Sequence, residues 1–174
     1  MPSEWDLIVI GSGSAGLVAS RTAARFGAKV LLVERNRLGG DCLWTGCVPS
    51  KSLIAAAHAA QVARASENLG VTASRVSVDF AQAMGHVRGA VNTITPHDSI
   101  EALGALGVDV RMGDARFTGP HSLDIEGEVH HFRQALIATG TSPRLPELPG
   151  ADTVAILTSD TVWELQELPP RLVI

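Results

Sequence analysis

The chain has 174 residues, of which 45% are hydrophobic, and a formal net charge of −4 at neutral pH. This length allows one domain with a sizeable core, and the acidic balance argues against a nucleic-acid partner held by a basic surface. No apolar run is long enough to cross a membrane, no signal-peptide pattern is visible, and two cysteines are too few for a secreted disulfide scaffold. We therefore expect a cytoplasmic protein without a membrane partner.

The first 34 residues predict a strand, a glycine-rich turn, a helix and a second strand. Residues 5–10 form an apolar strand, and the turn Gly-Ser-Gly-Ser-Ala-Gly follows at once. Residues 17–26 then form a small-residue helix closed by Gly27, and residues 29–33 form a strand that ends at Glu34. This order is typical of a Rossmann-like dinucleotide-binding unit.

The three glycines of the turn have separate roles in such a unit. Gly11 permits the tight turn, Gly13 lets a pyrophosphate approach the backbone, and Gly16 lets the helix and the strand pack closely. The helix start would bind the phosphates, and Glu34, which follows the first glycine by 23 residues, would accept hydrogen bonds from a ribose diol. The pattern predicts a dinucleotide site and disfavours NADP, while FAD and NAD both remain open.

The only two cysteines, Cys42 and Cys47, lie where a glycine-rich loop enters an alanine-rich helix predicted to run to about residue 68. A helix N-terminus favours a thiolate over a thiol. A disulfide between them requires non-helical backbone, which Gly46 allows, and Lys51 falls one turn after Cys47 on the same face. These residues leave open a redox-active pair, two inert buried cysteines, or a metal site, although structural zinc takes four ligands at closer spacing.

The middle of the chain predicts a second helix and then strands. Apolar residues recur at steps of three and four over residues 80–94, and Pro96 breaks the helix before the pattern continues to Leu106. Residues 107–117 are predicted as one strand, and the segments 122–125 and 129–136 as a hairpin around Gly127. A strand at 136–139 ends at another turn that could meet a cofactor. His121, His130 and His131 lie on these strands without a carboxylate pattern, so we predict no metal site.

The last thirty residues predict little regular structure. Three prolines mark a linker from residue 142 to 149, residues 158–168 are a short helix candidate, and residues 171–174 begin an apolar strand. The fold class expected is α/β, a parallel sheet with helices plus a small antiparallel β-meander.

Residues 39–51 read Gly-Gly-Asp-Cys-Leu-Trp-Thr-Gly-Cys-Val-Pro-Ser-Lys. This stretch resembles the redox-active signature of the pyridine nucleotide–disulfide oxidoreductases, FAD enzymes that include dihydrolipoamide dehydrogenase, glutathione reductase and mercuric reductase. The resemblance extends over essentially the whole chain, including the glycine turn, residues 113–117 and residues 138–140.

The resemblance implies a role for each matching residue. Cys42 and Cys47 would form the redox disulfide, with Cys47 facing the flavin, Cys42 exchanging with substrate, and Lys51 lying near the flavin ring. FAD would also contact the residues of the glycine turn, the end of the second strand, the cysteine loop and two later turns: Gly11, Gly13, Ser14, Ala15, Gly16, Glu34, Arg35, Gly40, Asp41, Ala115, Thr139 and Gly140.

The resemblance also implies the reaction and the missing parts. NAD(P)H would reduce FAD, FAD would reduce the disulfide, and the dithiol would exchange with a small-molecule disulfide, a quinone or a metal ion, in a homodimer. Residues 1–147 would be an FAD-binding domain, apparently truncated, 148–169 a linker, and 170–174 the first strand of an NAD(P)-binding domain outside this chain. An FAD-binding module without turnover, with a structural or regulatory disulfide, is the alternative.

Three positions depart from the family pattern. Asp41 stands where the best-known members carry threonine, and Trp44-Thr45 stands where they usually have Asn-Val. These differences weaken any assignment to glutathione or lipoamide as substrate.

Overall fold

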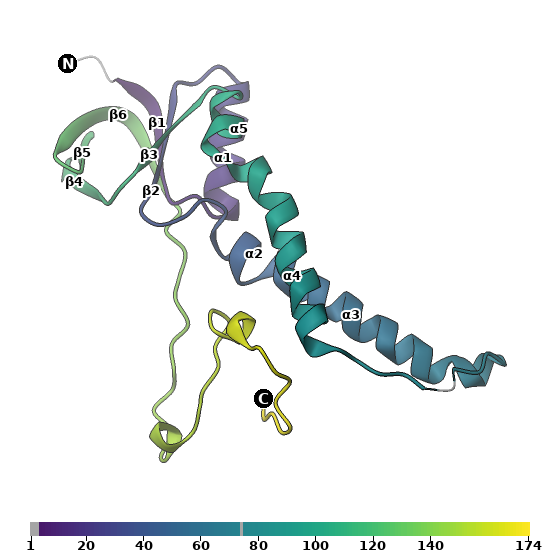
Figure 1. Cartoon of the computed structure of the whole chain (residues 1–174). Coiled ribbons are helices and arrows are strands. Elements are labelled where there is room, and N and C mark those ends of the chain that lie inside the picture. The colour runs from purple at the N-terminus through teal and green to yellow at the C-terminus, as the bar shows by residue number, and fades with distance from the viewer. Residues whose placement is uncertain (1–3, 74) are drawn as a thin grey trace. The chain divides into compact units, whose positions relative to one another are not determined.

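The computed structural model describes residues 4–73 and 75–174, which divide into two compact units. The sheet unit comprises the residues up to Cys42 together with Ile94–Ser142. The helical unit comprises Leu43–Thr93 together with Pro143–Ile174. Figure 1 labels the helices and strands of both units.

The sheet unit is built on four parallel strands in the order β3-β2-β1-β6. The first crossover runs from β1 (Trp5–Ile10) through helix α1 (Ser14–Arg25) to β2 (Val30–Glu34). Strand β3 (Val108–Met112) pairs with β2, and β6 (Glu128–Ile137) pairs with β1 on its other side. This is a Rossmann-like α/β arrangement, as the sequence predicts.

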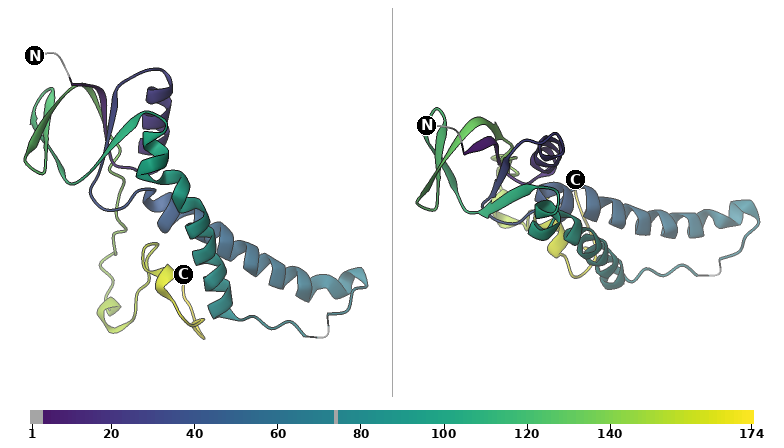
Figure 2. Two further views of the ribbon diagram at one scale, coloured as in Figure 1. Left: turned by 45° about the horizontal axis from the view of Figure 1, so that its top comes forward. Right: turned by 90° about the horizontal axis from the view of Figure 1, so that it is seen from above.

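Strand β6 belongs to two pairings. Its first residues pair antiparallel with β5 (Ser122–Ile125), which pairs in turn with β4 (Ala115–Gly119). Its later residues, from Phe132 to Ile137, run parallel to β1. The predicted meander is therefore continuous with the parallel sheet, and Figures 1 and 2 show it curling away from the sheet on the side opposite α1.

The core lies on both faces of the parallel strands, because successive side chains of a strand point to opposite faces. On the meander side, Ile8, Leu31 and Val33 pack with Leu123 and Phe132. The other face, toward α1 and the short helix α5 (Ile100–Gly104), holds these residues: Val9, Leu17, Val30, Leu32, Leu103 and Val108. The unbroken apolar run of β2 is explained by burial on both sides.

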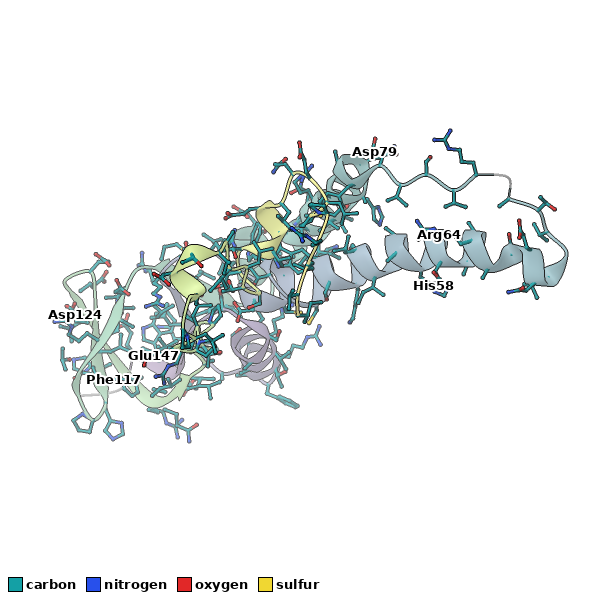
Figure 3. All side chains as sticks on the ribbon, turned by 90° about the horizontal axis from the view of Figure 1, so that it is seen from below. His58, Arg64, Asp79, Phe117, Asp124 and Glu147 are labelled. Atoms are coloured by element: carbon teal, nitrogen blue, oxygen red, sulfur yellow. The ribbon has the colours of Figure 1, made fainter. Side chains whose placement is uncertain are left out.

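The helical unit contains two long helices. Helix α3 (Cys47–Ala65) follows the short α2 (Gly40–Trp44), which begins in the sheet unit. Helix α4 (Phe80–Ile94) buries Met84, Val87 and Val91, the apolar stripe expected from its periodicity. Along α3 only Pro49 is buried, and Figure 3 shows His58 and Arg64, both exposed, on this helix. No helix in the described part of the chain is long and apolar enough to cross a membrane.

Several predicted bounds agree with the structure. The first strand and the second long helix have the predicted limits, and the hairpin turns at Gly127, which has a positive φ of 90°. The alanine-rich helix ends at Ala65 and continues as a 3-10 helix to Leu69.

Two strand predictions were wrong in their bounds. Residues 107–117 are two strands, because the chain leaves the parallel sheet at Gly113, whose φ is 147°. The predicted strands 129–136 and 136–139 are instead the single strand β6, which ends at Ile137.

The C-terminal elements also differ from the prediction. Residues 158–168 contain only a 3-10 helix, Val162–Glu164, since threonine hydroxyls hydrogen-bond the backbone locally and compete with an α-helix. Residues 171–174 are not in a strand, and a strand requires a neighbour to pair with. The domain boundaries at 147 and 169 stay predictions.

Candidate functional site

The parallel strands end together at one edge of the sheet, where ligands bind in open α/β folds. A cavity of about 420 Å³ opens at this edge within the sheet unit. It brings together predicted cofactor contacts that are far apart in the sequence: Gly11, Glu34, Arg35, Ala115, Thr139 and Gly140.

Strand register explains why these segments meet. Ile10 is paired with Val33 on one side and with Ile137 on the other. Just beyond, the Gly11 amide donates to the Val33 carbonyl at 2.8 Å, and the Ala138 amide donates to the Ile10 carbonyl at 2.8 Å. The turns that follow three strands are therefore fixed side by side by backbone hydrogen bonds.

The glycine turn is tightly packed against its surroundings at two positions. Gly11 has a φ of 101°, and a Cβ there would lie 2.3 Å from the carbonyl oxygen of Ala138. A Cβ on Gly16 would lie 1.8 Å from the carbonyl oxygen of Gly11. At Gly13 the only heavy atom within 4 Å of such a Cβ is the Cα of Gly40, at 4.0 Å. The turn thus excludes side chains at its base and stays open at Gly13.

Gly40 holds the start of the cysteine segment against this turn. Its φ is 55°, and a Cβ would lie 2.5 Å from the Cα of Gly13. The amide of Gly39 donates to the carbonyl of Ser12 at 3.1 Å. Two glycines are required here because two backbone segments approach each other without room for side chains.

The Glu34 carboxylate lies at the cavity and is held by backbone and side-chain donors. Its Oε2 accepts from the Ser12 amide at 2.9 Å and from the Ser12 hydroxyl at 2.7 Å, and its Oε1 accepts from the Asn36 amide at 2.9 Å. Burial alone would raise the pKa of Glu34, but the hydrogen bonds from Ser12, Asn36 and Arg35 outweigh it and hold this pKa below its usual value. Oε2 thus accepts two hydrogen bonds and Oε1 accepts one, so the lone pair left for a ligand is on Oε1.

Sequence reasoning missed Ser12. Its position between Gly11 and Gly13 could have revealed it, because parallel pairing of the first two strands brings the turn that follows the first strand next to the residue that ends the second. Ser12 is fully buried, and it orients the acid on which the predicted ribose contact depends.

The backbone amides at the N-terminus of α1 are not hydrogen-bonded by a capping side chain. Gly13 is its N-cap and makes no side-chain cap, and the first turn contains no acidic residue. Ser14 and Ala15, both predicted contacts, are exposed there. Uncapped amides at a helix start favour an anion such as a phosphate.

The two cysteines lie on consecutive helices. Asp41 and Cys42 are in α2, Cys47 is the first residue of α3, and Thr45 and Gly46 form the non-helical break that the sequence requires. Cys42 is half-buried and Cys47 is exposed, and both are thiols not joined to each other. A dithiol is one of the two states of a redox pair, so the disulfide stays a prediction.

Lys51 is exposed on α3, four residues after Cys47. This spacing puts the two residues one helical turn apart on the same face, as predicted. Its contact with a flavin stays a prediction.

The histidines of the meander do not form a metal centre with the groups around them. His130 is buried, with Nδ1 3.5 Å from Glu4 and Nε2 3.9 Å from Glu128. Within residues 4–73 and 75–174, no group of three or more histidine, cysteine or acidic side chains is arranged to hold a metal ion.

Comparison with known proteins adds relatives that cover nearly the whole chain. A mercuric reductase of Staphylococcus aureus is 36% identical over 171 residues, which are 98% of this chain and 31% of that enzyme. A dihydrolipoyl dehydrogenase of Bacillus subtilis (strain 168) is 39% identical over 178 residues, which are 99% of this chain and 37% of that enzyme. The chain therefore spans about a third of the length of these curated relatives.

The family model described as pyridine nucleotide-disulphide oxidoreductase matches residues 5–174. This match confirms the resemblance that was drawn from the cysteine signature and the glycine turn. The chain therefore belongs to the pyridine nucleotide-disulphide oxidoreductase family.

Proposed function

We propose that this chain is the FAD-binding and cysteine-carrying part of an NAD(P)H-dependent oxidoreductase. The observation that carries the proposal is the ionised Glu34 at the cavity, beside a glycine turn whose backbone is kept free of side chains. Family membership supports a flavin rather than a nicotinamide in this first dinucleotide site.

The residues at the cavity fit the adenosine diphosphate half of FAD. The remaining lone pair of Glu34 Oε1 would accept from a ribose hydroxyl, and the uncapped start of α1 beside Gly13 would hold the pyrophosphate. The backbone around Ala115, Thr139 and Gly140 would supply the remaining contacts.

Cys42 and Cys47 would carry the redox chemistry of the polypeptide. Bound FAD would supply two-electron transfer between a nicotinamide and this pair. Cys47 is the first residue of α3 and is exposed, so a bound cofactor would be able to reach its sulfur. Cys42 would then exchange with substrate, and Lys51 would lie near the flavin ring.

The substrate class we propose is a small-molecule disulfide, a quinone or a metal ion. The relatives' names, mercuric reductase and dihydrolipoyl dehydrogenase, support a metal ion or a disulfide. NAD(P)H binding and a homodimeric assembly would belong to the complete protein, since the chain spans about a third of these relatives.

The test is a titration of the purified chain with FAD, followed by flavin fluorescence and absorbance. We expect saturable binding that Glu34→Gln weakens about tenfold, the equivalent of one charged hydrogen bond lost. Glu147→Gln, at an exposed position of the linker, is the matched control and should bind as the unchanged chain does. A chain that binds NAD⁺ but not FAD would overturn the cofactor assignment.

A further inference from the structure

The break between the two cysteine helices is held by a residue from the far end of the chain. The indole N–H of Trp163 donates to the carbonyl oxygen of Thr45 at 2.9 Å, and also to that of Ser159 at 2.7 Å. Trp163 and Thr45 belong to the same compact unit although 118 residues separate them in the sequence.

The turn that carries Trp163 is itself ordered by local hydrogen bonds. The Thr158 amide donates to the Thr161 hydroxyl oxygen at 2.9 Å, and the Asp160 amide donates to the Thr158 hydroxyl oxygen at 3.2 Å. The Val162 amide closes the turn on the Thr158 carbonyl at 3.0 Å. The indole is therefore presented by a preformed turn, so little side-chain freedom is lost in the bond to Thr45.

Thr45 occupies a sensitive position. It follows Cys42 by three residues and precedes Cys47 by two. Thr45 and Gly46 are the two residues between α2 and α3. Gly46 is the N-cap of α3, and the Gly46 carbonyl accepts from the Ser50 amide at 3.0 Å. A bond to the Thr45 carbonyl consequently restrains the segment whose conformation decides how the two sulfurs can approach.

We propose that Trp163 is a positioning residue for the Cys42–Cys47 pair, acting through the Thr45 carbonyl. This inference rests on the proposed function. The hydrogen bond is made while the two sulfurs are not joined, and in this proposal it favours the dithiol because S–S closure would displace the Thr45 carbonyl from Trp163. Forming the S–S bond requires residues 43–46 to change conformation so that the two sulfurs meet, and a hydrogen bond that restrains this segment opposes that change.

The experiment measures the disulfide-to-dithiol ratio of the chain in mixtures of oxidised and reduced dithiothreitol. In this exchange the two thiols lose two electrons and two protons as the S–S bond forms, and oxidised dithiothreitol takes them up. Acid quenching, alkylation and mass measurement give the ratio. Trp163→Phe keeps an aromatic ring at this position and removes the donor, and we expect it to raise the ratio about fivefold, the effect of one lost hydrogen bond of about 1 kcal/mol.

The matched control is Trp5→Phe. Its indole nitrogen is buried without a hydrogen-bond partner, so this change removes an N–H that bonds nothing and should leave the ratio unchanged. An unchanged ratio in Trp163→Phe, or an equal rise in Trp5→Phe, overturns the inference while the redox pair stands. If the unaltered chain forms no Cys42–Cys47 disulfide in any mixture, the proposed redox pair itself fails.

A second measurement needs no folded Trp163 variant. The chain labelled with ¹⁵N has three indole N–H resonances, and the variants Trp5→Phe and Trp44→Phe identify two of them. The third resonance belongs to Trp163, and in the unaltered chain it should shift when the cysteines are oxidised. A Trp163 resonance that stays fixed on oxidation contradicts the coupling.

Discussion

The sheet unit and the helical unit differ in how their candidate site residues are held. Of the buried hydrophobic residues among those that the structure describes, thirteen lie in the sheet unit and four in the helical unit. The cavity at the sheet edge is bounded by strand ends locked in register, whereas Cys47 and Lys51 are exposed at the start of a helix that buries only Pro49. A binding site gains from a fixed shape, and a pair that opens and closes a covalent bond gains from a lightly packed segment.

The largest effect should come from closing the space at the base of the glycine turn. Gly16→Ala would place a methyl group against the Gly11 carbonyl oxygen, where backbone cannot yield cheaply. We expect a loss of at least about 3 kcal/mol in the free energy of unfolding, measured with urea. Gly89→Ala on α4 is the matched control, since a Cβ there meets nothing within 4 Å and should stabilise by up to about 1 kcal/mol. Equal changes in the free energy of unfolding at Gly16 and Gly89 would contradict the contrast between the tightly packed glycine turn and the lightly packed helical unit.

Truncating an apolar side chain should lower the free energy of unfolding far more in the sheet unit than in the helical unit. Leu32→Ala empties a fully buried site in β2 and should cost about 3 kcal/mol. Ile54→Ala on α3 removes a side chain that is 65% exposed, and its cost should stay below about 0.5 kcal/mol. The same urea titration checks both, and a large loss at Ile54 would show that α3 is covered in solution.

The Ser12–Glu34 contact predicts a dependence of stability on pH. Because the folded state lowers the pKa of Glu34, its contribution is fully present above the ordinary value of 4.5 and is lost as pH falls through the lower folded value. Ser12→Ala should cost about 1 kcal/mol at pH 7, allowing for the partial exposure of the carboxylate. Urea unfolding at pH 7 and at pH 3 measures this, and a cost that does not shrink in acid argues against an ionised Glu34.

The smallest effect on stability is expected at the cysteines. Cys47→Ser replaces an exposed thiol by a hydroxyl and should change the free energy of unfolding by less than about 0.5 kcal/mol. It should nevertheless abolish disulfide formation under oxidising conditions, detected by thiol counting after alkylation. A marked loss of stability in Cys47→Ser would place this residue in the core rather than in an accessible site.

Local patterns were sufficient to predict much of the fold. The strand at 5–10 and the helix at 80–94 carry their own periodicity, and the glycine turn carries its own conformational signal. The split at Gly113 was missed because 107–117 contains no proline or polar cluster, and the break depends on β4 leaving to pair with β5.

The candidate site divides in the same way. Its glycines, Glu34 and the cysteines follow from spacing within short motifs, so the amino-acid sequence alone identifies them. The contacts of Ser12 with Glu34 and of Trp163 with Thr45 link residues 22 and 118 positions apart, and only the register of strands or the path of the C-terminal segment brings them together.

The double pairing of β6 has a consequence for the order of events during synthesis. The glycine turn and Glu34 leave the ribosome early, but the cavity also needs Thr139 and Gly140, which follow β6. Strand β6 follows β1 by more than a hundred residues in the sequence. Until it docks beside β1, the Gly11 backbone has no Ala138 carbonyl to pack against. A nascent chain that ends before β6 therefore carries the complete glycine turn and still lacks the cavity at the sheet edge.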